Sequence, residues 1–133
     1  MPVRSDPMPI LRSYFDALEA ARFEEAAKCF TEGVFYSHPP FPGEGVANPR
    51  HEANGRQALI QLFMLRGKRP RRHRIDSCVV EGNHAFISGV SLNPPDPRSS
   101  FMSELKLSDD GLIDYYVTYS SVPGVGVTLE TQT

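Results

Sequence analysis

The chain has 133 residues, of which 40% are hydrophobic and 23% are charged, and its formal net charge is -2. These values are ordinary for one soluble globular domain, residues 1–133, and they argue against a disordered or a membrane protein. No apolar run reaches the roughly 18 residues that a spanning helix needs, and the amino terminus lacks the apolar core of a signal peptide, so we expect a cytoplasmic protein with no membrane partner. The two cysteines, Cys29 and Cys78, form no CxxC motif and are interpreted as reduced, buried thiols.

Two amphipathic helices are predicted at the amino end. Asp6 followed by Pro7 is typical of a helix start. The first helix is predicted from an apolar stripe with the spacing i, i+3, i+4 and i+7. The second is shorter and is predicted to end at Gly33. The stripes are Leu11, Tyr14, Phe15 and Leu18, and then Phe23, Ala26, Ala27 and Phe30.

The segment VFYSHPP, residues 34–40, predicts a short strand that ends at two prolines. Alternation places Val34, Tyr36 and His38 on one face. Pro39 holds His38 extended, at the point where the strand gives way to a loop. A histidine in this place is either a structural polar group or a catalytic one, and the strand alone does not decide between them.

Residues 41–54 are predicted to form a loop, and Asn54 to cap a third helix, GRQALIQLFMLRG, over residues 55–67. This helix is apolar almost all the way round, so we expect other elements to enclose it.

A basic run, RGKRPRRHR, follows at residues 66–74 and holds six of the 14 Lys and Arg residues. It contains no aromatic residue to stack on a base and matches no nucleic-acid motif, so nucleic-acid binding is not expected. The run is better interpreted as a helix end that favours cations, with Gly67 as the stop. It would then form a solvated patch or a rim that faces an anion.

The remainder predicts four strands, 73–80, 84–92, 101–107 and 112–121, joined as two hairpins by a proline-rich connection. Because side chains alternate between the two faces of a strand, we expect three pairs to share a face: Phe86 with Ser88, Ser103 with Leu105, and Tyr116 with Thr118. Three helices and then antiparallel strands indicate the α+β class.

Four segments together resemble the nuclear transport factor 2-like superfamily, which includes ketosteroid isomerases, scytalone dehydratase and the SnoaL-like polyketide cyclases. They are LRSYFDALEAARFEEAAKCF, VFYSHPP, GRQAL and LKLSDDGLIDYYV. The resemblance runs from about Leu11 to Ser121 and implies one SnoaL-like domain. It also implies a cone, in which a strongly bent antiparallel sheet curls around a long helix and two amino-terminal helices complete the wall.

The resemblance also implies site residues. Tyr14 matches the tyrosine that donates to the developing oxyanion in ketosteroid isomerases, and His38 matches the base that abstracts the proton. Ser103 matches a protonated aspartic acid, the second oxyanion donor of those enzymes. A neutral imidazole can accept a proton at physiological pH, but a serine is no equivalent of a buried carboxylic acid, so steroid isomerisation is not expected.

Other chemistries lack support in the sequence. The acid/base aspartate of the SnoaL-like cyclases falls near Ser120 or Ser121, and the Asp, Arg, Asp set of epoxide hydrolases of this fold cannot be assembled. The four histidines have no metal-ligand spacing, and there is no GxSxG, GxGxxG or P-loop. We therefore expect neither a metal nor a cofactor.

Two functions remain open. In the first, the chain is an enzyme that isomerises, dehydrates or cyclises a small, largely apolar molecule with a carbonyl or hydroxyl group, through His38 as base and Tyr14 as oxygen-polarising donor. In the second, the cone is a non-catalytic ligand carrier or a homodimer that meets its copy through Tyr115, Val117 and Tyr119. The residues expected to bind the ligand are Phe63, Phe86, Ser88, Ser103, Tyr116 and Thr118.

Overall fold

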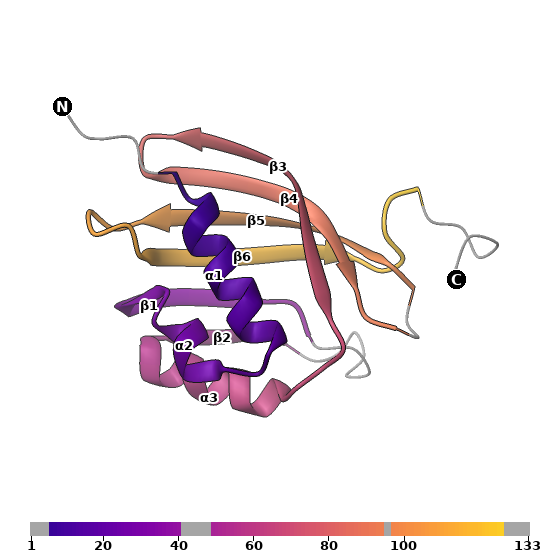
Figure 1. Ribbon diagram of the computed structural model, residues 1–133, viewed down its shortest axis with the longest axis horizontal. Coiled ribbons are helices and arrows are strands. Elements are labelled where there is room, and N and C mark those ends of the chain that lie inside the picture. Colours follow the sequence, from indigo (N-terminus) through magenta and orange to yellow (C-terminus); the bar gives the residue numbers. More distant parts are fainter. Residues whose placement is uncertain (1–5, 41–48, 95–96, 127–133) are drawn as a thin grey trace.

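A computed structural model describes residues 6–40, 49–94 and 97–126. Three helices pack against one six-stranded sheet (Figure 1). The helices are α1 (Met8–Glu19), α2 (Phe23–Ala27) and α3 (Arg56–Arg66). The strands are β1 (Phe30–His38), β2 (His51–Asn54), β3 (Arg72–Glu81), β4 (His84–Leu92), β5 (Ser99–Leu107) and β6 (Ile113–Ser121).

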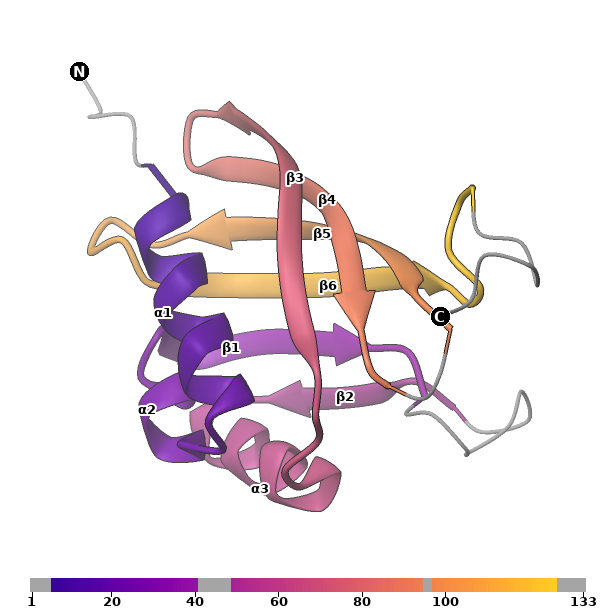
Figure 2. The same ribbon diagram turned by 45° about the vertical axis from the view of Figure 1, so that its right-hand side comes forward.

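The strand order is β2-β1-β6-β5-β4-β3, and every neighbouring pair is antiparallel except β1 with β6, which is parallel. The sheet is strongly curled, and β3 crosses in front of the other strands at a steep angle (Figure 2). The inner face of the curl packs against α1. The α+β class and the curled sheet predicted from the sequence are confirmed.

The β3–β4 pair contains an irregularity that helps the sheet to curl. The register of this pair shifts between Ile75 and Ser77, and Gly89 lies opposite Ile75. A Cβ at Gly89 would collide with the carbonyl oxygen of Arg74 and lie 3.0 Å from the Phe101 ring. A bulge on one strand and a glycine on its neighbour together let the two backbones approach and bend.

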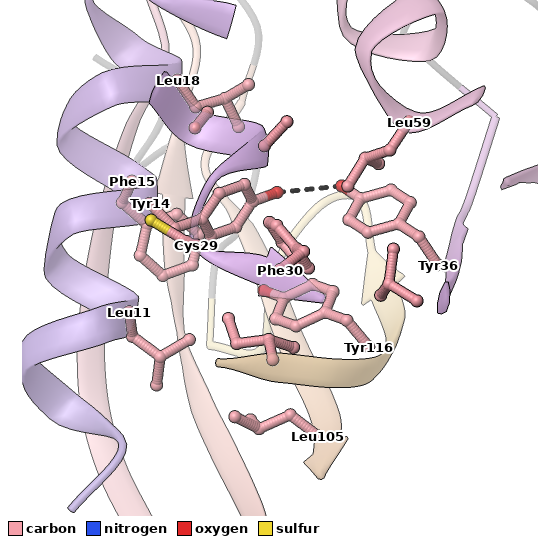
Figure 3. Packing of buried hydrophobic residues seen from close by; sticks show 14 of the residues in the cluster. Leu11, Tyr14, Phe15, Leu18, Cys29, Phe30, Tyr36, Leu59, Leu105 and Tyr116 are labelled. Atoms are coloured by element: carbon pink, nitrogen blue, oxygen red, sulfur yellow. Dashed lines mark hydrogen bonds between the residues drawn. The ribbon is translucent and has the colours of Figure 1, made fainter. Parts of the chain in front are cut away.

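The apolar stripe of α1 lies in the core, as its spacing predicts. The carboxylate of Asp6 accepts a hydrogen bond from the Met8 backbone N–H at 3.0 Å, which supports the helix start. Figure 3 shows this face of α1 packing against aromatic side chains of β1 and β6.

Several sequence-based predictions about these elements need correction. The second helix ends at Ala27, so Phe30 begins β1 instead of ending a helix. The predicted loop contains β2, which includes Asn54, and α3 begins after Gly55; residues 41–48 of that loop lie outside the described residues. Helix α3 is not enclosed, because Met64 and Leu65 are 57% and 71% exposed.

Within the three ranges that the structure describes, no helix combines the length and the apolar character needed to cross a membrane.

Candidate functional site

A cavity of about 330 Å³ lies between α1 and the inner face of the curled sheet. Its wall draws on α1, β1, the end of α3, and strands β3 to β6. Aromatic rings form much of the wall, and a smaller number of polar groups face the same space. The lining residues that bear on its chemistry are Tyr14, Tyr36, His38, Arg66, Arg71, His73, Ser91, Tyr116 and Thr118.

Two phenols meet inside this wall. The hydroxyl of Tyr14, from α1, lies 2.9 Å from that of Tyr36, from β1 (Figure 3). Burial raises the pKa of both phenols above the ordinary tyrosine value, so both stay protonated. One hydroxyl donates to the other, and the accepting one keeps its own proton for a further acceptor. The pair can therefore donate to an oxygen atom in the cavity.

A third phenol belongs to β6. The Tyr116 ring stacks on Tyr36 with centroids 5.4 Å apart and planes 8° apart. Its hydroxyl accepts a hydrogen bond of 3.3 Å from Ser103, which also bonds the Thr118 hydroxyl at 2.7 Å. Burial raises the pKa of Tyr116 as well. This chain of hydroxyl groups holds the Tyr116 hydroxyl in place.

His38 ends β1 on the same face as Tyr36, and the two rings are parallel within 4° at 6.3 Å. Its Nδ1 lies 2.8 Å from the Pro39 carbonyl oxygen. A carbonyl only accepts, so Nδ1 carries the proton and Nε2 is the basic nitrogen of the neutral ring. Burial lowers the pKa of His38 to about 3; the bond to Pro39 opposes the shift, and the charges of Arg71 and Arg66 add to it.

His73, on β3, closes the opposite wall. It stacks on Phe15 with centroids 4.4 Å apart. Glu19 accepts two hydrogen bonds from it, 2.8 Å from the backbone N–H and 3.0 Å from Nδ1. Burial lowers the pKa of His73 in spite of this carboxylate. The neutral ring is a fixed wall element, and its two hydrogen bonds hold the Glu19 carboxylate behind the wall.

Two arginines complete the polar part of the wall. Arg66 is the last residue of α3, where Gly67 ends the helix with a positive φ of 70°. Arg66 is only 7% exposed, and Arg71, just before β3, also lies in the wall. Burial lowers the pKa of both, that of Arg71 to about 10, so both remain charged at neutral pH.

The structure brings together some of the residues that the sequence singles out and separates others. Tyr14, His38, Tyr116 and Thr118 line the one cavity. Phe63 and Ser103 are buried behind its wall, where Phe63 packs on the Tyr14 and Tyr36 rings.

The expectation that Phe86 and Ser88 line the cavity is wrong. Both point to the outer face of β4, where Phe86 is 44% exposed and Ser88 bonds Ser77. Alternation groups Phe86 with Ser88 correctly, but the inner face of β4 is that of Ala85 and Ile87.

Sequence reasoning missed Tyr36, Arg66, Arg71 and His73 as site residues. A signal for Tyr36 was available, because it lies two residues before His38 on the same strand face. The arginines and His73 belong to the basic run. The sequence allows two interpretations of this run, a solvated patch and a rim that faces an anion. The structure buries Arg66 instead of leaving it as part of a solvated patch.

Among residues 6–40, 49–94 and 97–126, no three His, Cys, Asp or Glu side chains gather closely enough to hold a metal ion.

Many solved structures share this fold at low sequence identity. A protein from Kribbella flavida DSM 17836, named as a candidate ketosteroid isomerase, is 19% identical with a TM-score of 0.64, and the match covers 86% of this chain and 77% of that one. An epoxide hydrolase of M. tuberculosis is 15% identical with a TM-score of 0.65, covering 87% and 83%. A cystatin-like protein from Methylobium petroleophilum PM1 is 15% identical with a TM-score of 0.67, covering 92% and 80%.

These likenesses establish the fold and leave the activity open, because this fold hosts unrelated functions. Among curated proteins, none matches the chain. The family model for the SnoaL-like domain matches residues 11–116, a span that includes most of α1, all of α2, the strand of His38 and most of the sheet. The chain therefore belongs to the SnoaL-like domain family.

Proposed function

We propose that the cavity binds a small, largely apolar molecule that carries a carbonyl or hydroxyl oxygen. One observation supports this most: the Tyr14 and Tyr36 hydroxyls and the His38 imidazole line one aromatic space of about 330 Å³. That volume is at the lower end of small-molecule sites. The phenols would donate to the ligand oxygen, and the rings would bury its apolar part.

We further propose that His38 moves a proton. Nε2 would take a proton from the carbon next to the carbonyl, and the C–H electron pair would shift to form an enolate. The enolate oxygen would gain the hydrogen bond from the phenol pair, and Nε2 would return the proton to another position of the product. Isomerisation, dehydration and cyclisation can all begin with this step.

Exchange of deuterium into cyclohexanone tests the proton transfer without knowledge of the natural substrate. In D2O, the protein should speed α-proton exchange, followed by NMR. A positioned base contributes about 100-fold or more, so His38→Gln should remove most of the acceleration. Tyr14→Phe should also reduce it, since Tyr36 then loses its partner.

Two matched variants serve as controls. His84, on the outer face of β4, bonds Glu104, and Tyr119 lies on the outer face of β6. His84→Gln and Tyr119→Phe should leave exchange unchanged. Ketone binding without exchange would favour the alternative, a non-catalytic carrier. If neither binding nor exchange occurs, the proposal is wrong.

We also propose a homodimer, formed through the outer face of the sheet. Large apolar side chains are exposed on four neighbouring strands, and the register places them in adjacent pairs, Val79 beside Phe86 and Met102 beside Tyr119. Several large apolar side chains exposed on one sheet face favour cover by a second copy. The centre of this proposed interface differs from the surface of Tyr115, Val117 and Tyr119 that the sequence predicts, because Val117 is only 5% exposed.

A further inference from the structure

The two arginines of the cavity wall have no acidic counterpart among the described residues that line it. Of the lining residues that the structure describes, none is Asp or Glu. The carboxylate of Glu19 influences Arg66, but its hydrogen bonds go to His73. Arg66 and Arg71 each lower the pKa of His38, so their charge reaches the cavity itself. The wall is therefore positively charged on the side of α3 and β3.

Three buried donors on this wall lack a hydrogen-bond partner among the described residues. They are Nη2 of Arg66, Nε of Arg71 and Oγ of Ser91. Arg66 is more than nine-tenths buried, and its Nη1 makes only a long contact of 3.5 Å with the Gly67 carbonyl. Buried polar groups are nearly always paired, and a buried charge is costly unless an opposite charge accompanies it. Three such donors in one cavity wall favour a ligand that brings hydrogen-bond acceptors to this side of the cavity.

We infer that the ligand of this cavity is a carboxylate, held by Arg66 and Arg71 with Ser91, while its apolar body lies against the aromatic wall. The inference rests on the proposed function and names the substrate class: a small carboxylic acid that also carries a carbonyl or hydroxyl oxygen. A carboxylate has two oxygens and about four acceptor positions, enough for the three donors. Guanidinium groups bind such planar anions especially well.

The apolar lining of the cavity favours an organic acid over inorganic phosphate. Phe15, Leu18 and Phe101 line the same space, so one end of the ligand must be apolar. A small aromatic or alicyclic acid satisfies both ends. Phosphate is accordingly one arm of the test.

A bound carboxylate would also act on His38. Arg71, Arg66 and His73 all lower the pKa of His38, and only the Pro39 carbonyl opposes them. An anion between the arginines would offset their charge and favour the protonated imidazole. The base would then be strongest when the acid is bound.

Benzoate and benzamide provide a matched pair that differs in charge and hardly in shape. In ¹⁵N-labelled protein, the buried Nε–H of Arg71 can be followed by NMR and assigned from its loss in Arg71→Met. Benzoate should shift this resonance and bind about 10-fold or more tightly than benzamide, because charge-assisted hydrogen bonds are the stronger ones. Arg66→Met and Arg71→Met should remove the preference; in Arg71→Met, which lacks the Nε–H reporter, binding is followed instead by the backbone amide resonances of the cavity wall. Arg72→Met, an exposed neighbour in the same basic run, should retain it.

The outcomes separate the two proposals. Equal binding of benzoate and benzamide would overturn the carboxylate site and leave the ligand cavity standing. A response to inorganic phosphate and none to benzoate would overturn the carboxylate class. If neither aromatic probe moves the Arg71 resonance while cyclohexanone exchange is still accelerated, the carboxylate inference alone is wrong; if exchange is absent as well, both proposals are. Melting temperatures of the variants show whether a lost response reflects lost folding.

Discussion

His38 links the chemistry of the cavity to the stability of the fold. Its pKa is about 3 in the folded protein and near 6.5 in an unfolded chain. The fold therefore favours the neutral ring. This preference contributes fully to stability above about pH 6.5, and the contribution is lost as the pH falls from there toward 3, because the unfolded chain takes up the proton first.

We expect the free energy of unfolding to fall between pH 7 and pH 5, by about 2 kcal/mol from His38 alone. The lowered pKa of buried His73 acts in the same direction. Urea unfolding at several pH values measures the slope. His38→Gln should flatten it, and Tyr119→Phe on the outer face, which removes no imidazole, should leave it unchanged. Equal slopes for wild type and His38→Gln would contradict the buried neutral imidazole.

At this scale, the sequence predicts some site residues and not others for physical reasons. Tyr14 and His38 follow from local periodicity, helical for one and strand-like for the other, together with a family pattern. Whether Arg66 and Arg71 line the cavity depends on the path that the chain takes after the end of α3, which no local pattern predicts. Charges in a basic run are usually solvated, and only the tertiary fold buries Arg66.

Among the elements, the β3–β4 pair determines the shape of the cavity. The register shift in β3 and the bend at Gly89 carry the start of β3 across the inner face, and with it Arg71 and His73. These two residues could not reach the wall from a flat sheet. The site thus depends on the close approach of the β3 and β4 backbones at Gly89, where there is no room for a side chain.

Gly89→Ala should destabilise the protein by about 1–3 kcal/mol, since its Cβ meets the Arg74 carbonyl and the Phe101 ring and one of them must move. Gly33→Ala is the matched control, because a Cβ there has open space and needs no positive φ. Thermal or urea unfolding compares the two. A Gly89→Ala protein as stable as Gly33→Ala would show that β3 and β4 are not held closely at this point.

The predicted elements succeed where a single periodicity dominates. The stripe of α1 has such a period, and it is confirmed. Phe30 fits the apolar stripe of a helix and the buried face of a strand equally well, so the pattern does not decide between them. The structure places it at the start of β1. On β4 both faces carry apolar residues. Alternation therefore shows which residues share a face but not which of the two faces points into the core.

For the whole molecule, the outer sheet face predicts self-association. Sedimentation velocity should show a dimer, and Met102→Asp should shift it toward monomer, since a charge would enter the centre of the interface. Leu65→Asp, on the exposed side of α3, introduces the same charge elsewhere and should leave the dimer intact. A wild-type monomer at high protein concentration would show that the patch has another role.

The tyrosine cluster also determines how this protein can be observed. There is no tryptophan in the chain, and three of its five tyrosines, Tyr14, Tyr36 and Tyr116, surround the cavity. Near-ultraviolet absorbance and emission therefore come largely from rings that a bound molecule would touch. The interior of the cone thus carries its own optical reporter, with no added label and no indole background.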